Sequence, residues 1–477
     1  MSTRARTSSL VYFGIGQLPS SIKGNLLGAP IFFYYNNVLG LNAWLVSLAL
    51  FISLIIDAFT DPMVGYISDY TQSRWGRRHP YIFGSIIPGV LSYWALPNVH
   101  LGDSQAVLFF QLLLLMAVLR LAWTFYQVPK DGLGAEISKD YHQRTQLAGL
   151  NSLFGWIGGA TISYLTSAVF LGNSYSNAKG YAELAWWGAG AILVFALIFA
   201  FGTAREIPTL ESPRQHPKRL REILADIIET LNHRSWLMLF LAGVVYSVQI
   251  GLTGGLTFYF NSFFWDWKPT DVAIFAIVDL GGALLVGAFA AQIASRFDKK
   301  RLAIGLFIFA TIIHPLVLIL RLLDIHFGTQ LLPPNGPKYG ALWWIMMAQS
   351  LAVSSTAAMA FILVGSMTAD VVEDSQRKTG KRSEGLFFAG PHLVQKCVSG
   401  LGLMIKGLIL TAVGFSAAAP VAAKVNAIEQ LAIVIVVIYV VSPLISLTLL
   451  SRYEITRETH EDNLQNLGYQ DKDVTDT

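Results

Sequence analysis

Long apolar stretches that alternate with short polar ones set the pattern of this chain. Each stretch has about the 20 residues that an α-helix needs to cross a bilayer. The pattern predicts an all-α membrane protein with twelve transmembrane helices, near 11–35, 43–68, 81–97, 105–129, 146–171, 184–203, 236–262, 270–294, 302–323, 341–368, 385–413 and 427–451.

Composition agrees with a membrane protein and narrows the chemistry. Hydrophobic residues make up 53% and charged residues 13% of the chain, and the mean hydropathy is +0.51. A globular protein carries roughly twice that share of charge. The single cysteine, Cys397, excludes an internal disulfide and a CxxC centre, and we expect it to pack within its helix.

The basic residues predict the orientation. Lys and Arg gather in one set of alternate loops and at the N-terminus, whereas the opposite loops offer only Lys179, Lys268, Lys338 and Lys424. By the positive-inside rule both termini face the cytoplasm of a multi-pass protein in the cell (inner) membrane. The net charge of +4 therefore reflects topology, and we expect no nucleic-acid partner. No cleavable signal is expected, because the first span is long and follows a polar start.

The longest polar segment between spans divides the chain into two predicted bundles. Residues 1–204 and 235–451 each form six helices, 205–234 is a cytoplasmic linker with an interfacial helix, and the acidic 452–477 is a disordered cytoplasmic tail. An internal repeat supports these halves. Short matches recur at an offset of about 222 residues, which carries Asp57 onto Asp279, and again at about 234 residues.

Two aspartates, Asp57 and Asp61, lie inside the apolar stretch 43–67. A charge at bilayer depth costs roughly 2.5–3.5 kcal/mol on insertion scales, so the pair needs a compensating partner. The spacing i, i+4 puts both on one helix face, where like charges repel. A buried Lys or Arg is one candidate for that partner, but we favour a coupling cation.

Three blocks of sequence, in order along the chain, resemble the glycoside–pentoside–hexuronide:cation symporters, the melibiose permease family of the major facilitator superfamily. The blocks cover residues 57–80 (with DAFTDP and RWGRRHP), 129–145 and 366–396. The resemblance implies the twelve-helix major facilitator fold in two six-helix halves, with alternating access between them.

The resemblance also implies a cation site. Asp57 and Asp61 take the positions of the carboxylates, Thr60 that of a residue that tunes ion choice, and Thr124 that of a hydroxyl on the fourth helix. Oxygen ligands suit Na⁺, and H⁺ is the second candidate. For both threonines, a bond back to the own helix is the structural alternative. Lys396 is implied to pair with Asp57 or Asp61 and to act as a coupling switch, because its ammonium can neutralise the carboxylates when the cation leaves. The alternative is a purely structural ion pair that holds the halves together.

The predicted solute site departs from the family. Where the family has two sugar-binding aspartates, this chain has Ser21 and Gln127, and where the family has a tryptophan, it has Phe361. His392 faces the same region. Lys23 and Arg120 are additional cations, each with a structural alternative, and together they favour an anionic solute such as a hexuronide.

Charged loop residues are predicted to form inner-gate ion pairs. Asp69 is expected to pair with Arg77 and Arg78, and Asp370 or Asp374 with the basic residues of the following loop. That loop contains Lys378, Lys381 and Arg382.

The sequence therefore predicts a symporter that couples Na⁺ or H⁺ flow to uptake of a glycoside, pentoside or hexuronide. Transport of an amphiphilic lipid or other organic anion is the alternative. We expect no enzyme, because the histidines within spans, His314 and His392, form no HExxH motif. We expect no cofactor, no metal beyond the coupling cation, membrane lipid as surroundings, and a monomer.

Overall fold

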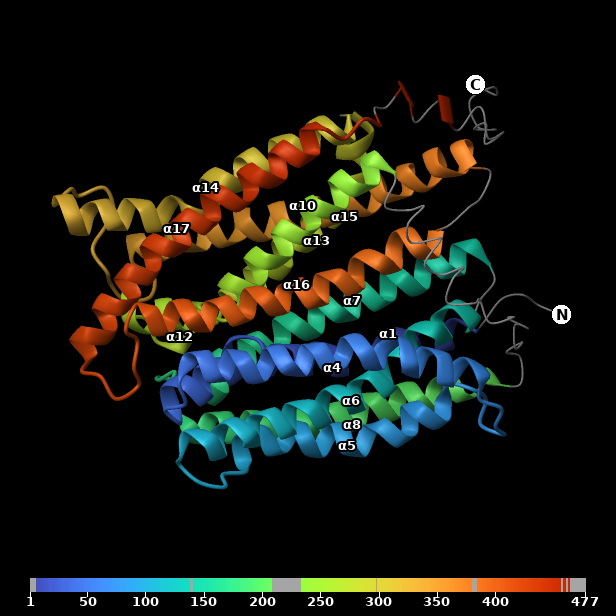
Figure 1. The fold of residues 1–477 in the computed structure, drawn as a ribbon, viewed down its shortest axis with the longest axis horizontal. Coiled ribbons are helices and arrows are strands. Elements are labelled where there is room, and N and C mark those ends of the chain that lie inside the picture. The colour runs from blue at the N-terminus through green and yellow to red at the C-terminus, as the bar shows by residue number, and fades with distance from the viewer. Residues whose placement is uncertain are drawn as a thin grey trace.

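The computed structural model describes residues 6–137, 140–207, 233–296, 298–379, 384–455, 458–459 and 462–463, without the side chains of 135, 141–142, 291, 293–295, 378–379 and 384–397. Every regular element in this part of the chain is a helix (Figure 1). The N-terminal half consists of α1 (Thr7–Ile15), α2 (Leu18–Leu27), α3 (Ala29–Phe33), η1 (Tyr34–Val38), α4 (Ala43–Tyr70), α5 (His79–Asn98), α6 (Gln105–Ile137), α7 (Tyr141–Leu165), η2 (Thr166–Leu171) and α8 (Ala178–Ala204). The C-terminal half consists of α10 (Arg234–Thr253), α11 (Thr257–Tyr259), η4 (Phe260–Phe264), α12 (Pro269–Val272), α13 (Phe275–Arg296), α14 (Lys299–Phe327), α15 (Ala341–Thr379), α16 (Glu384–Ala412) and α17 (Val421–Ser451).

Nine helical segments within the described residues are long and apolar enough to cross a membrane. Three further predicted spans coincide with α1–η1, α5 and α16, which are interrupted, shorter or described as apolar only over Val398–Ala412. The all-helical fold is confirmed, whereas the count of twelve crossing helices stays a prediction for these three.

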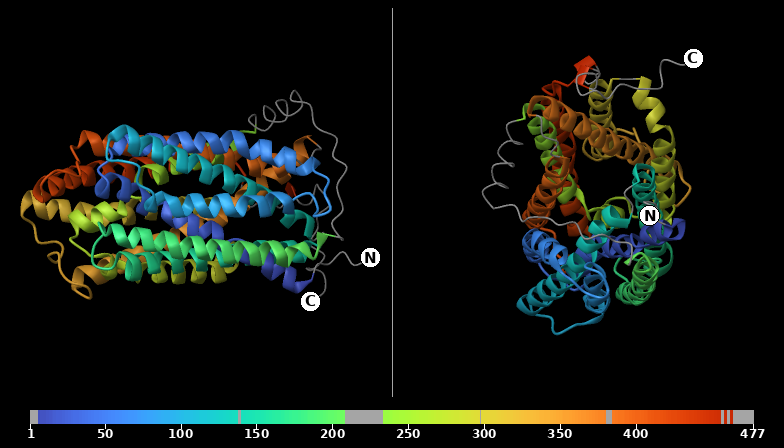
Figure 2. Two further views of the ribbon diagram at one scale, coloured as in Figure 1. Left: turned by 90° about the horizontal axis from the view of Figure 1, so that it is seen from below. Right: turned by 90° about the vertical axis from the view of Figure 1, so that its right-hand side faces the viewer.

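The two halves lie side by side, and α1 starts at the end of the molecule where α17 finishes (Figures 1 and 2). They meet chiefly where α4 packs against α16 and where α7 packs against α13. The internal repeat explains this pairing. An offset of about 222–234 residues carries α4 onto α13 and α7 onto α16, so each contact is converted into the other by the same two-fold relation.

The first helix of each half is broken near its far end in the same way. Gly28 ends α2 and Gly254 ends α10, and each is followed by a short α-turn and then a π-turn, η1 or η4. The second glycine after α10, Gly255, has φ +85°, which disfavours any residue with a Cβ. The sequence pattern predicts one continuous helix in both places, because the broken segments remain apolar.

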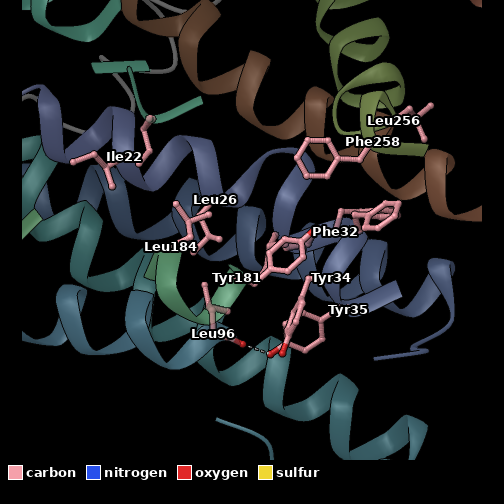
Figure 3. Close-up of a cluster of buried hydrophobic side chains, with 14 of the residues drawn as sticks. Ile22, Leu26, Phe32, Tyr34, Tyr35, Leu96, Tyr181, Leu184, Leu256 and Phe258 are labelled. Carbon is pink, nitrogen blue, oxygen red and sulfur yellow. Dashed lines mark hydrogen bonds between the residues drawn. The ribbon is translucent and has the colours of Figure 1, made fainter. Parts of the chain in front are cut away.

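These two broken ends, residues 28–38 and 254–264, meet in an aromatic contact that we call the seam. Phe33 packs against Tyr259 with ring centroids 4.9 Å apart, and against Phe258 at 5.9 Å. The Tyr259 hydroxyl donates to Asn36 Oδ1 at 2.7 Å. Figure 3 shows Phe32 and Phe258, from different halves, in one buried cluster. The seam therefore closes the end of the molecule opposite the start of α1.

A buried lysine supports the seam. Lys406 of α16 is only 2% exposed, donates to the carbonyl of Gly254 at 2.6 Å, and lies 4.1 Å from the ring centroid of Phe32. The glycine break leaves a carbonyl at the end of α10 without a helical donor, and the ammonium group supplies one. Lys406 thus connects the C-terminal half to an aromatic ring of the N-terminal half.

The linker and the C-terminal tail are the two predicted segments outside the helical bundles. The linker and its interfacial helix fall mostly on 208–232, outside the described residues. The predicted disordered tail begins too early, because Tyr453 and Ile455 are 1% and 5% exposed within the C-terminal half. The Tyr453 hydroxyl also donates to the carbonyl of Met367 at 3.2 Å. Two apolar side chains among acidic neighbours were enough to anchor this stretch.

Candidate functional site

Asp57 forms a buried ion pair with Arg120. The Arg120 Nη1 donates to Asp57 Oδ2 at 2.6 Å, and its Nε donates to the Ser53 hydroxyl at 2.9 Å. Asp57 is 8% exposed and the Arg120 side chain 15%, so neither charge is well hydrated. The helices α4 and α6 pack together and bring the two charges into contact. A basic side chain therefore neutralises Asp57, which is the structural alternative left open by the sequence.

Asp61, one turn further along α4, faces hydroxyl groups instead. Thr124 Oγ1 donates to Asp61 Oδ1 at 2.9 Å, and the Thr60 and Thr124 hydroxyl oxygens are 3.4 Å apart. Thr60 also donates to the carbonyl of Ile56 at 2.9 Å, as its structural alternative predicted. The structure brings Asp61, Thr60 and Thr124 together, whereas it separates Asp57 from them by giving it a different partner.

The spacing on the two helices explains this division. Arg120 and Thr124 are four residues apart on α6, as Asp57 and Asp61 are on α4. Because α4 and α6 run in the same direction, matched i, i+4 pairs on the two helices make two successive contacts. Once Thr124 is placed opposite Asp61, Arg120 falls opposite Asp57. The sequence held this signal, although our interpretation placed Arg120 beside the solute.

The group around Asp61 has the chemistry of an alkali-cation site. A carboxylate and two hydroxyls are oxygen ligands, which hard cations prefer. Pro62 within α4 cannot donate a helical hydrogen bond, so it leaves a carbonyl one turn earlier available as a further oxygen. The residues present therefore fit a small monovalent cation on Asp61. Whether Asp57 also contacts that ion stays a prediction.

The predicted solute residues of the N-terminal half are engaged with their own half. The Ser21 hydroxyl donates to the carbonyl of Gly155 at 2.9 Å. The Gln127 amide donates to Asp131 at 2.9 Å and accepts from Ser20 at 2.7 Å. The Lys23 ammonium lies 4.8 Å from the ring centroid of Trp123. With Arg120 bonded to Asp57, the argument for an anionic solute loses the cation on which it mainly rested.

The structure describes only some of the predicted solute and coupling residues of the C-terminal half. Phe361 on α15 is 76% exposed. Lys396 and His392 lie on α16, but their side chains are outside the described ones. Because α16 packs against α4, the helix of Lys396 adjoins the helix of both aspartates. Its pairing with Asp57 or Asp61 stays a prediction.

The charged loop residues form ion pairs within each half. Arg78 contacts Asp69 at 2.5 Å, and both Arg77 and Arg78 contact Glu136 of α6, at 2.6 Å and 2.9 Å. Arg78 also donates to the Ser68 hydroxyl at 2.8 Å. These contacts tie the α4–α5 loop to the end of α6.

The C-terminal half repeats this arrangement with other partners than those predicted. Asp370 pairs with Lys299 at 2.7 Å, and Asp374 with His233 at 2.9 Å and Arg377 at 3.5 Å. Arg382 lies outside the described residues, as do the side chains of Lys378 and Lys381. The repeat offsets of 222 and 234 carry Arg77 onto Lys299 and Glu136 onto Asp370. Once one of these ion pairs is known, the offsets predict the other.

The comparisons with known proteins assign the chain to a class of transporters rather than enzymes. The chain matches the family described as MFS/sugar transport protein over residues 12–457, and it belongs to that family.

Individual relatives agree with this assignment. The chain is 25% identical to an "Uncharacterized symporter sll1374" of Synechocystis, over 97% of this chain and 96% of that protein. It is 24% identical to the "Isoprimeverose transporter" of Lactiplantibacillus pentosus, over 88% and 83% of the two chains. Its fold is similar to the crystal structure of a D-xylose–proton symporter, with a TM-score of 0.61 at 14% identity over 92% and 96% of the two chains.

Proposed function

We propose that this protein is a secondary active symporter that couples the inward flow of Na⁺ or H⁺ to uptake of a glycoside, pentoside or hexuronide-like solute. The observation that carries the proposal is the arrangement on α4 and α6. An oxygen cluster on Asp61 lies one turn from the neutralised pair Asp57–Arg120, within a fold of the sugar transport family. The names of the relatives, a symporter and an isoprimeverose transporter, support the same class.

Na⁺ is the coupling ion that we favour, with H⁺ as the second candidate. Thr60 and Thr124 add neutral oxygens around Asp61, which a metal cation can use and a proton does not need. Because Arg120 already balances Asp57, we assign the cation to the oxygen atoms around Asp61.

The way the halves meet supports alternating access as part of this proposal. The seam closes the end opposite the start of α1, and the ion pairs at the other end hold helices within each half. If both termini are cytoplasmic, as we propose from the basic loops, the seam is the outer gate of a monomer in the cell membrane.

The test is uptake into proteoliposomes under an imposed Na⁺ or pH gradient, with isoprimeverose, lactose, methyl β-glucuronide and lysophosphatidylcholine as solutes. We expect Na⁺-driven accumulation of a sugar and its loss in Asp61→Asn. The control is Asp103→Asn, because that side chain is 98% exposed on a loop. Undiminished uphill transport in Asp61→Asn would overturn the cation site.

The same panel separates the alternatives. Accumulation of lysophosphatidylcholine but of no sugar would replace the sugar proposal with the lipid one. Transport driven by a pH gradient in Na⁺-free buffer, and unaffected by added Na⁺, would assign H⁺ as the coupling ion.

A further inference from the structure

A cavity of about 430 Å³ lies on the C-terminal side of the contact between the halves. Its lining comes mainly from α10 to α17, while Ser163 and Ser167 contribute from α7 and η2 of the other half. The volume is within the range of roughly 300–1,000 Å³ that is typical of small-molecule sites. None of the predicted solute residues whose side chains the structure describes lines it.

An aspartate without a basic partner lines this cavity. Asp279 of α13 accepts a hydrogen bond from the Ser350 hydroxyl of α15 at 2.7 Å. Among the described residues, no Lys, Arg or His forms an ion pair with it. Its counterpart by the repeat, Asp57, is neutralised by Arg120, whereas position 354, which corresponds to Arg120 at the offset of 234 that relates α6 to α15, is a serine. The carboxylate therefore keeps capacity to accept hydrogen bonds from a ligand.

His314 of α14 adds a second polar group without a partner. Both of its ring nitrogens are buried, and neither has a hydrogen-bond partner in the part of the chain that the structure describes. Its ring contacts Tyr439 at a centroid distance of 5.4 Å. A buried imidazole that lines a cavity with both nitrogens unused is costly unless a ligand or water occupies that cavity.

Gln349, next to Ser350, is fixed in place by its amide group. Its Nε2 donates to the carbonyls of Ile313 and His314, at 2.6 Å and 3.2 Å. Because the donor side of the amide faces the backbone of α14, the carbonyl oxygen is the side that remains for another contact. Together, a carboxylate, an imidazole and an amide oxygen offer mostly acceptors.

Aromatic rings make another part of the cavity wall apolar. Trp265 and Trp267 are stacked with centroids 6.1 Å apart, and Phe275 packs edge-on against Trp267 at 6.3 Å. All three rings line the cavity. Aromatic faces are apolar and flat, so they suit a ligand that has one C–H face and a rim of hydroxyl donors.

We propose that this C-terminal cavity is a solute subsite for a neutral sugar ring, with Asp279 and His314 bonded to its hydroxyls and the tryptophans packed on its apolar face. The inference rests on the proposed symport function and assigns the solute contacts to a place where the chain has unused polar groups. A uronate is disfavoured, because its carboxylate would face Asp279 without a cation between them. The residues bonded within the N-terminal half need no role in this subsite.

The test measures binding and transport separately on the full chain in nanodiscs and proteoliposomes. Calorimetry with isoprimeverose, methyl β-glucoside and methyl β-glucuronide gives dissociation constants for wild type, Asp279→Asn and His314→Leu. We expect the neutral sugars to bind about tenfold to hundredfold more weakly to either variant, the range for lost hydrogen bonds to charged or buried groups. The control is Glu429→Gln, a carboxylate of the same half that does not line the cavity.

A charge-specific readout keeps the test independent of stability. Wild type should bind the glucoside more tightly than the glucuronide. Asp279→Asn should bring the two dissociation constants closer together, because the negative charge that repels the glucuronide is gone. If Asp279→Asn does not fold, Ser350→Ala tests the same carboxylate through its hydrogen-bond donor.

Two outcomes would overturn the inference, and they differ in what they leave standing. Sugar transport by wild type with unchanged sugar affinity in both cavity variants overturns the subsite and leaves the symport function intact. Absence of sugar binding and sugar transport in wild type overturns both.

Discussion

The sharpest test of the site is to break the buried pair between Asp57 and Arg120. Arg120→Gln removes the basic partner of the Asp57 carboxylate among the described side chains, and Asp57 is 8% exposed. Removing one member of a buried ion pair costs about 3–5 kcal/mol, because the other charge is left uncompensated. For a cooperative unit the size of one half, a destabilisation of about 1 kcal/mol lowers the melting temperature by about 2–4 °C. We therefore expect a fall of roughly 6–20 °C.

The double variant Asp57→Asn/Arg120→Gln provides the matched control. It removes both charges and keeps two side chains that can hydrogen bond, so we expect it to recover about 2–3 kcal/mol of the loss. The measurement is thermal unfolding of purified wild type, both single variants and the double variant in the same detergent. The coupling in this cycle reports the pair itself.

A different pattern would contradict the reasoning. If Arg120→Gln melts like wild type and selectively lowers uptake of methyl β-glucuronide relative to methyl β-glucoside, then Arg120 faces the solute. In that case the anionic interpretation of the sequence would return.

Three further predictions concern the coupling residues and the gates. Thr124→Val should raise the Na⁺ concentration needed for half-maximal uptake, because it removes the hydroxyl bonded to Asp61. Thr124→Ser keeps a hydroxyl and should keep the wild-type Na⁺ dependence. Unchanged Na⁺ dependence in the valine variant would exclude Thr124 from the site. Lys396→Ala should shift coupling toward protons, and in wild type a water-soluble amine reagent should label Lys396 differently with and without Na⁺; equal labelling would end the idea of a buried pair. Gly255→Ala should destabilise the seam by about 1–2 kcal/mol, because the backbone φ of Gly255 is +85° and the new Cβ would lie 3.3 Å from Lys406 Nζ. An unaltered melting temperature would contradict this prediction.

Much of the fold was predictable because apolar periodicity and charge position are local features of the sequence. The importance of Asp57 and Asp61 was predicted from the free-energy cost of burying two carboxylates in a membrane helix. The contact of Asp61 with Thr124 follows from the family resemblance. The pairing of Asp57 with Arg120 was not the favoured prediction, which placed Arg120 beside the solute. This pairing depends on the relative rotation of two helices, which spacing constrains only after one contact is known. Sequence repeats carried the same kind of information for Lys299 and Asp370.

The remaining misses have physical causes. The breaks at Gly28 and Gly254 are invisible to hydropathy, since glycine interrupts a helix without making it polar. The cavity around Asp279 and His314 draws on helices far apart in the chain, so only the packed structure brings its polar groups together. Tyr453 was predicted to lie in a disordered tail because that segment is acidic, although its ring and the Ile455 side chain are buried.

The aromatic seam makes the two faces of the transport cycle respond differently to temperature. Its contacts are mostly apolar, between rings such as Phe33, Phe258 and Tyr259, and apolar association weakens on cooling. The ion pairs at the opposite end are largely buried and lie within each half, so salt screens them little and they are kept when the halves part. Cooling should therefore favour the state in which the seam is parted, and a cysteine placed on Phe33 should become more reactive toward a membrane-impermeant reagent at 4 °C than at 37 °C, after correction for the intrinsic rate.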